Sequence, residues 1–212
     1  MYLNEPKSFD LEYSVQQLKK VDPALTEMFN QVQVNPLEPE KNYFQSLIRS
    51  IIYQQLSGSA AKKIFNRFKK IYSVNAFPKP KDVFSTDIEI LRSSGLSYNK
   101  AQYIKNIAKA FLDEPDTYNN LAKMGDEDII QTLTKVKGIG LWTAQMFLMF
   151  TLNRPDIFPA TDLAMQKGYQ EFFKLLELPK PREMIKKSKL WIPYRTTVSL
   201  YLWAILEGPF EW

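Results

Sequence analysis

Apolar residues recur at steps of three and four along most of the chain, which is the spacing of one face of an α-helix. One such run comprises Phe44, Leu47, Ile48, Ile51, Ile52 and Leu56. A second run follows a break at Ser57-Gly58-Ser59 and comprises Ala60, Ala61, Ile64, Phe65 and Phe68. The pattern predicts a helix, a tight polar turn and a second helix.

The same spacing predicts helices elsewhere in the chain, over about residues 9–20, 22–30, 87–94, 99–111, 126–133, 141–151, 163–178 and 193–207. Pairs of prolines separate several of these segments. Alternating apolar and polar positions bounded by hairpin dipeptides, which would indicate strands, are missing from the sequence. We therefore expect an all-α fold.

Composition adds size and class to this prediction. The 212 residues, 45% hydrophobic and 24% charged, are typical of a globular protein that buries one core or two closely packed subdomains. A net charge of +5 is compatible with a nucleic-acid partner but does not by itself indicate one. We see neither a signal peptide nor a membrane-spanning run, and expect a cytoplasmic protein.

Two residue types are absent, and their absence narrows the chemistry. Without cysteine there is no disulfide, thiol nucleophile or iron–sulfur cluster held by thiolates. Without histidine, serine-protease triads and most transition-metal sites are excluded as well. Any catalysis must use Asp, Glu, Lys, Tyr or the backbone.

The segment Gly138-Ile139-Gly140 joins two predicted helices. A P-loop or a dinucleotide fingerprint requires other neighbours, including a third glycine where Thr143 stands. Glycines at a helix start can expose backbone N–H groups to a phosphate, and apolar Val136 and Ile139 would lock such a turn. The alternative is a plain helix–helix turn, which is the more common meaning of an isolated Gly-x-Gly.

A lone carboxylate, Asp162, precedes the helix predicted from residue 163. Its position suits an N-cap, where Asp accepts hydrogen bonds from free backbone N–H groups. It also suits catalysis, because the positive end of a helix stabilises an ionised carboxylate. The position alone does not separate the two interpretations.

Four segments, taken in order, resemble the helix-hairpin-helix (HhH-GPD) DNA glycosylase superfamily, and more narrowly its 3-methyladenine DNA glycosylase II type. They are Gln54-Gln-Leu-Ser57, Gly138-Ile-Gly-Leu-Trp-Thr-Ala144, Phe158-Pro-Ala-Thr-Asp-Leu163, and Trp191-Ile-Pro-Tyr-Arg195 running on to Trp203. They span roughly residues 40–208. The short segment before them implies the compact form, without an extra N-terminal β domain.

The resemblance assigns roles to residues of these segments. It implies that Asp162 is the catalytic carboxylate and that DNA phosphate binds at Gly138, Ile139, Gly140 and Thr143. It also implies a Na⁺ or K⁺ ion held by the backbone carbonyls of Thr134, Val136 and Ile139. Trp142 stands where lyase members carry the Schiff-base lysine, so the implied activity is monofunctional.

An enzyme that acts on a base within a duplex flips the nucleotide out and fills the gap. The resemblance points to Gln55 and Leu56 as the wedge, although Leu56 could equally complete an apolar helix face. Aromatic rings attract a cationic alkylpurine. We expect Trp142 and Trp203 in the base pocket, with Trp191 and Tyr194 as further candidates behind them, whereas Arg195 could meet a phosphate or an acid.

The expected architecture has two helical subdomains with the active site in the cleft between them. Residues 43–152 would carry the wedge and the hairpin, and residues 1–42 with 153–212 would carry Asp162.

The leading hypothesis is a monomeric, monofunctional glycosylase that excises alkylated purines such as 3-methyladenine and 7-methylguanine from duplex DNA, without a required cofactor. In a bacterial or archaeal cell it would associate with the nucleoid. The alternatives are a noncatalytic helix-hairpin-helix DNA-binding module and a glycosylase for another lesion, such as a deaminated or etheno-adduct base.

Overall fold

The structure is a computed structural model that describes residues 9–56, 58–72 and 76–207. These residues form helices joined by short loops and include no strand, which confirms the all-α prediction. Ser57, part of the predicted polar turn, lies outside the described residues. Within the described ranges, no helix is both long and apolar enough to cross a membrane.

The chain divides into two compact units. Unit 1 joins residues 1–39 to 148–212, and unit 2 comprises residues 40–147. The sequence placed these boundaries at 42/43 and 152/153, a few residues further along the chain. The hairpin therefore lies in unit 2, whereas Asp162 lies in unit 1.

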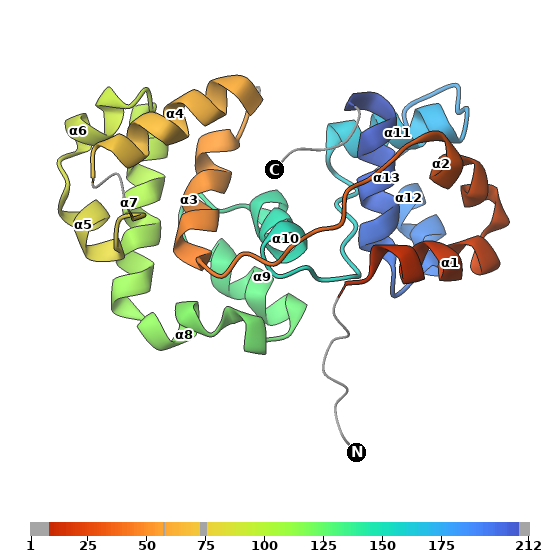
Figure 1. Cartoon of the computed structure of the whole chain (residues 1–212), viewed down its shortest axis with the longest axis horizontal. Helices are drawn as coiled ribbons and strands as arrows, with labels where there is room; N and C mark the ends of the chain where they lie inside the picture. The colour runs from red at the N-terminus through yellow and green to blue at the C-terminus, as the bar shows by residue number, and fades with distance from the viewer. Residues whose placement is uncertain (1–8, 57, 73–75, 208–212) are drawn as a thin grey trace, which may run out of the picture. The chain divides into compact units, whose positions relative to one another are not determined.

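Unit 2 is built around the long helix α7, which packs against α3 and α5 (Figure 1). Apolar residues of α3 and α7 such as Ile48, Ile51 and Ile104 are completely buried. The helices are α3 (Tyr43–Tyr53), α4 (Gly58–Lys70), α5 (Pro80–Ser85), α6 (Ile88–Ser93), α7 (Tyr98–Asp113), α8 (Pro115–Asn119), η2 (Leu121–Lys123), α9 (Asp126–Thr134) and α10 (Leu141–Phe150), the last of which runs on into unit 1.

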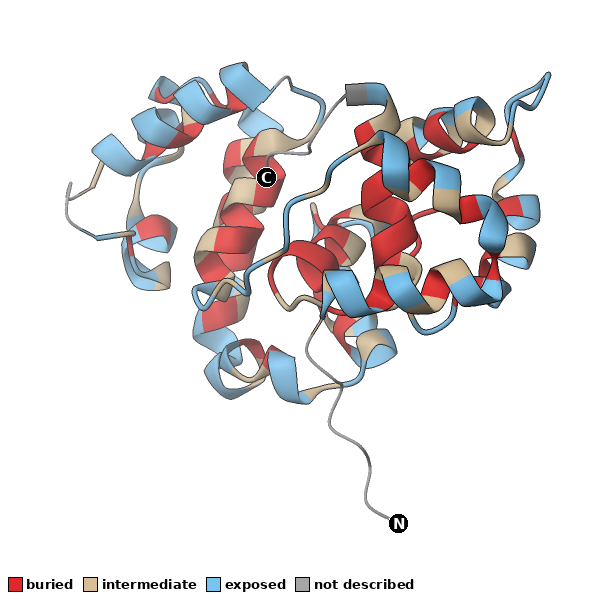
Figure 2. Cartoon of the chain, turned by 45° about the vertical axis from the view of Figure 1, so that its right-hand side comes forward, coloured by how far each residue is buried: buried red, intermediate tan, exposed pale blue. Residues whose placement is uncertain are grey.

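Unit 1 is centred on α13, which is buried along most of its length (Figure 2). Helix α11 approaches α13 so closely that a Cβ atom on Gly168 would lie 2.0 Å from the Leu202 carbonyl oxygen. Only glycine fits at this crossing. The elements are α1 (Leu11–Val21), η1 (Pro23–Leu25), α2 (Thr26–Gln31), α11 (Leu163–Phe172), α12 (Pro181–Ser188), η3 (Lys189–Trp191) and α13 (Arg195–Glu207).

Polar residues fix the starts of several helices. The side chains of Asn42, Ser97 and Asp162 each accept a hydrogen bond from a backbone amide three residues later. Such bonds satisfy N–H groups that have no partner within the helix. The helices that carry the candidate site are therefore held at their first turns.

The observed helices differ from the predicted ones at two kinds of place. Three short helices that the pattern did not predict begin with Pro80, Pro115 and Pro181 at their first positions. Proline suits a helix start because its fixed φ is helical and it lacks only an N–H that would be unpaired anyway. In addition, α11 ends at Phe172 rather than near residue 178, and Lys174 adopts a left-handed φ of 52°.

Candidate active site and phosphate-binding hairpin

Asp162 is the N-cap of α11, and its carboxylate accepts two hydrogen bonds. The Met165 amide donates to Oδ1 at 2.8 Å, and the indole Nε1 of Trp203 donates to the same oxygen at 2.9 Å. One donor is local and the other lies 41 residues away on α13. The carboxylate is therefore fixed by two helices at once.

Trp203 is itself held firmly. Its ring is 4% exposed, and its centroid lies 6.1 Å from that of Phe150 in a stacked arrangement. The contact of α11 with α13 at Gly168 sets the distance between the two helices that carry Asp162 and Trp203. The geometry of this pair thus depends on a backbone contact elsewhere on α11.

The arrangement leaves Asp162 half-buried at the positive end of a helix. A carboxylate in this position can stabilise positive charge that develops on a nearby group or can orient a water molecule. Asp162 does cap its helix, as one interpretation of the sequence proposed. Capping does not exclude chemistry, because the same hydrogen bond also orients the carboxylate.

Trp191 is a core residue rather than part of a base pocket, which corrects the sequence-based assignment. It is 0% exposed, and its Nε1 donates to Asp22 at 2.9 Å. Lys187 forms an ion pair with the same Asp22 oxygen, also at 2.9 Å. Because the ring has no exposed face, it cannot stack on a base.

Two neighbouring residues of unit 1 have partners within that unit. Tyr194 packs edge to face on Tyr13 of α1, with the ring centroids 6.1 Å apart. The Arg195 guanidinium donates two hydrogen bonds to Asp156, at 2.7 and 2.8 Å. Of the two roles left open for Arg195, the structure therefore shows pairing with an acid.

In the hairpin of unit 2, only one of the two glycines needs to be glycine for its conformation. Gly138 has a φ of 112°, and a Cβ atom there would lie 2.3 Å from the ring of Tyr103. Gly140 has no such φ, is exposed, and would offer its Cβ open space. Gly138 therefore gives the turn its backbone conformation, whereas Gly140 leaves open space at the surface of the turn.

Helix α10 starts directly after the hairpin, and its Ala144 amide donates to the Gly140 carbonyl at 3.0 Å. Residues 141–143 precede this bond, and in the first turn of a helix the backbone N–H groups point out of the helix start. They are the N–H groups that an anion could meet. Trp142 lies half-buried on this first turn.

The Thr143 side chain does not point to the exterior. It is 2% exposed, and its hydroxyl oxygen accepts a hydrogen bond from Gln54 Nε2 at 3.0 Å. The hydroxyl is therefore buried and engaged within unit 2. Only the backbone amide of Thr143 remains as a phosphate donor.

The predicted wedge residues lie beyond the end of α3. Gln55 is exposed and adopts a left-handed φ of 57°, and Leu56 is 40% exposed. Leu56 does not complete the apolar face of α3, because that helix ends at Tyr53. Both side chains are accessible, as a wedge requires.

We call residues 54–56, which follow α3, the wedge loop. Sequence reasoning did not assign a role to Gln54, which bonds this loop to Thr143, or to Lys100, which bonds it to α7. Gln54 was noticed only as part of a motif. A long polar side chain at the end of an apolar helix is the signal that could have identified it. Lys100 carries no comparable signal, since a lysine near a helix start is ordinary on a surface.

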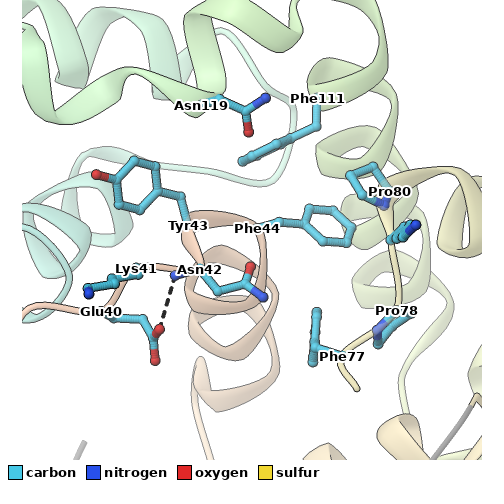
Figure 3. A pocket seen from close by; sticks show the side chains of 11 residues that line it. Glu40, Lys41, Asn42, Tyr43, Phe44, Phe77, Pro78, Pro80, Phe111 and Asn119 are labelled. Atoms are coloured by element: carbon cyan, nitrogen blue, oxygen red, sulfur yellow. Dashed lines mark hydrogen bonds between the residues drawn. The ribbon is translucent and has the colours of Figure 1, made fainter. Parts of the chain in front are cut away.

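A pocket of about 480 Å³ opens elsewhere in unit 2 (Figure 3). Phe44, Phe77 and Phe111 form its aromatic side, and Glu40, Lys41 and Asn119 are among its polar lining residues. None of the predicted site residues lines it.

Comparison with known proteins gives a consistent result. A DNA-3-methyladenine glycosylase 1 of Schizosaccharomyces pombe is 39% identical over 165 residues, which cover 77% of this chain and 72% of that protein. An alkylbase DNA glycosidase-like protein of the same organism, mag2, is 34% identical and is covered over 95% of its length, with 94% of this chain matched.

The structure of a 3-methyladenine DNA glycosylase from Schizosaccharomyces pombe, in complex with abasic DNA, superposes with a TM-score of 0.78 at 33% identity, covering 95% of this chain and 99% of that one. The model of the HhH-GPD superfamily of base excision DNA repair proteins matches residues 48–193, which include the wedge loop, the hairpin and Asp162. By this match and these relatives, the chain belongs to the HhH-GPD superfamily of base excision DNA repair proteins.

Proposed function

We propose that the protein is a DNA glycosylase that removes alkylated purines, such as 3-methyladenine and 7-methylguanine, from duplex DNA in base excision repair. The observation that carries this proposal is the Asp162 carboxylate, held by Trp203 and by the start of α11. Membership of the superfamily and the names of the relatives support the substrate class.

The chemistry suits a carboxylate without a strong acid beside it. The bond between C1′ of the sugar and the purine nitrogen breaks, and the base keeps the electron pair. An alkylated purine is already cationic, so it leaves as a neutral base without prior protonation. The sugar develops oxocarbenium character that the Asp162 anion stabilises. Water then adds to C1′ and loses a proton, which leaves an abasic site.

The expected product is an abasic site on an intact strand. A lyase step requires an amine that attacks C1′ to form a Schiff base. Trp142 occupies the position two residues after Gly140 where that lysine would stand, and an indole cannot form this bond. We therefore assign a monofunctional reaction.

The hairpin would hold one phosphate of the DNA through the backbone amides at the start of α10. The exposed Gly140 leaves space for a phosphate to approach the backbone. The carbonyls of Thr134, Val136 and Ile139 would hold a Na⁺ or K⁺ ion, for which neutral carbonyl oxygens are suitable ligands. The Val136 carbonyl already accepts the Ile139 amide at 3.0 Å, and a carbonyl oxygen has a second lone pair for an ion. Such an ion would add positive charge beside the phosphate.

Gln55 and Leu56 would enter the duplex and fill the gap left by the flipped nucleotide. Trp142 would contact the extruded base. Trp203 is 4% exposed, so its proposed role is to hold Asp162 rather than to stack on the base. The partner is damaged duplex DNA, and we expect the protein to act as a monomer in the compartment that holds the DNA.

The decisive test is Asp162→Asn on methylated duplex DNA, with abasic sites measured by alkaline strand cleavage. Asparagine caps a helix about as well as aspartate, so the fold and DNA binding should persist. Excision should fall by roughly a hundredfold or more, the size expected for loss of a charge that stabilises the transition state. Retained excision would show that Asp162 is only a cap. DNA binding without any excision by the unsubstituted protein would instead favour the noncatalytic DNA-binding alternative.

Borohydride trapping tests the monofunctional assignment separately. No covalent adduct between protein and DNA should form, because no lysine stands at position 142. A robust adduct would overturn this assignment and leave the glycosylase proposal in place. A panel of duplexes with alkylated, deaminated and etheno-adduct bases would identify the lesion.

A further inference from the structure

Three polar or aromatic residues of α7, spaced three apart, contact the two loops of unit 2 to which DNA binding is assigned. Lys100 contacts the wedge loop, and Tyr103 and Asn106 contact the hairpin. A spacing of three keeps them on neighbouring positions of one helix face. The two loops are thus supported from the same helix.

Lys100 secures the end of α3. Its Nζ donates to the Ile52 carbonyl at 2.9 Å and to the Gln54 carbonyl at 2.7 Å. The last carbonyls of a helix lack partners within it, and a lysine can satisfy them while interacting favourably with the helix dipole. Burial lowers the pKa of Lys100, so holding its ammonium here has a desolvation cost that these two bonds offset.

Gln54 joins this helix end to the hairpin. Its Nε2 donates to Thr143 Oγ1 at 3.0 Å and approaches the Gly138 carbonyl at 3.4 Å. The residue that follows it, Gln55, has a left-handed backbone and an exposed side chain. The direction in which Gln55 and Leu56 leave α3 therefore depends on how Gln54 is anchored.

Helix α7 also contacts the hairpin directly. The Tyr103 ring fills the space beside Gly138, and Asn106 Nδ2 donates to the Lys137 carbonyl at 3.0 Å. All of these bonds end on protein atoms of unit 2. None of the four supporting side chains needs to touch DNA to fix both loops.

We propose that Gln54 and Lys100 are positioning residues that hold the wedge loop and the hairpin in one fixed arrangement, so that wedge insertion and the phosphate grip occur together on a duplex. This inference rests on the proposed function, because it gives the two loops their DNA roles. It predicts that loss of Lys100 affects work on duplex DNA far more than work on single-stranded DNA, which needs no wedge.

The test compares Lys100→Met with a matched control on the same helix, Lys105→Met. Lys105 is also half-buried, and its Nζ donates to a backbone carbonyl, that of Thr86, at 2.6 Å. Both variants remove an ammonium from a carbonyl, but only Lys100 contacts the wedge loop. Excision is measured on methylated duplex and methylated single-stranded DNA, and the ratio of the two rates is the readout.

Lys100→Met should lower the ratio of duplex to single-stranded excision about tenfold, whereas Lys105→Met should leave it unchanged. Gln54→Met should act in the same direction, and the double variant should lose less than the product of the two single losses, because both residues serve one arrangement. A ratio that stays the same in Lys100→Met and Gln54→Met, in folded protein, overturns the inference.

A second measurement needs no substrate. Hydrogen exchange of the amides of residues 139–143 in the free protein should speed up at least severalfold in Lys100→Met and Gln54→Met but not in Lys105→Met. Unchanged exchange in all three variants overturns the inference even if the protein has no glycosylase activity. Absence of excision by the unsubstituted protein, with the exchange effect present, would overturn the proposed function alone.

Discussion

In the hairpin of unit 2, the groups assigned to the phosphate belong to the backbone, and side chains of other helices support them. In unit 1 the relation is reversed. The central group is the Asp162 side chain, and a backbone contact between Gly168 and Leu202 sets the distance between its two supporting helices. One site is made of main chain held by side chains, and the other of a side chain held by main chain.

The difference decides how each site can be altered. A single substitution removes the carboxylate of Asp162 and leaves its helix in place. No substitution removes a backbone amide of the hairpin except a proline, which would also change the turn. Substitutions can therefore test the hairpin only through the side chains that support it or through the open space at Gly140.

The largest effect is expected at the backbone contact of unit 1. Gly168→Ala places a Cβ atom against the Leu202 carbonyl oxygen, which cannot rotate away. We expect a loss of about 3 kcal/mol in the free energy of unfolding, as for severe overpacking. Urea unfolding followed by tryptophan fluorescence measures it. Gly58→Ala is the control, since its Cβ would meet nothing within 4 Å. A loss below about 1 kcal/mol would contradict the close approach.

The hairpin gives a contrast between two glycines. Gly138→Ala combines a left-handed φ with a clash against Tyr103 and should cost about 2 kcal/mol of stability. Gly140→Ala should leave the free energy of unfolding within about 0.5 kcal/mol of the original. It should nevertheless weaken binding to undamaged duplexes of any sequence about tenfold, because a methyl group would occupy the phosphate's approach. Equal DNA affinity in Gly140→Ala would count against the hairpin as a phosphate site.

The two indole–carboxylate pairs of unit 1 allow a matched test. Trp203→Phe removes the donor to Asp162 and should lower the single-turnover excision rate about tenfold, equivalent to one hydrogen bond. Trp191→Phe removes the donor to Asp22 and should lower stability by about 1 kcal/mol, while excision by the folded protein stays unchanged. If the two substitutions affected excision equally, the indole of Trp203 would have no special role.

The smallest expected effect is a loss of stability at alkaline pH, to which tyrosines of both units contribute. Burial raises the pKa of Tyr169 and Tyr201 in unit 1 and of Tyr72 and Tyr118 in unit 2. Folding favours the uncharged phenol, so this contribution is complete below about pH 10 and is lost as the pH rises through each folded pKa. The lowered pKa of Lys100 acts in the opposite direction.

Urea unfolding at successive pH values, with tyrosinate absorbance in parallel, should show stability falling above about pH 10. Tyr201→Phe and Tyr72→Phe should each make the decrease in stability over this pH range smaller. A level profile from about pH 9 to pH 11 would contradict the role of these phenols.

The sequence predicted the long helices well, because their apolar spacing reports burial on one face. The pattern does not predict the short helices that begin at Pro80, Pro115 and Pro181. Pro80 and Pro181 belong to proline pairs that indicate interruptions, and Pro115 stands outside any such pair. Helix α11 was predicted too long because Leu175, Leu176 and Leu178 continue its apolar character although they are exposed.

For the candidate site, the sequence singles out Asp162 and the hairpin, whose local surroundings carry the signal. The residues alone do not separate Trp203 from Trp191, because both are tryptophans in apolar segments, although the family resemblance ranked Trp203 first. Only packing shows that one faces Asp162 and the other Asp22. The same holds for Lys100 and Gln54, whose partners lie on other segments of the chain.

Gly140 has a consequence for how such proteins diverge. Because a side chain there meets no neighbour, descendants of this chain could acquire one without losing their fold. DNA affinity could then decay by drift in a lineage that still expresses a well-folded protein. Under the proposed function, position 140 and the carboxylate at position 162 therefore say more about the repair activity of a family member than its helices do.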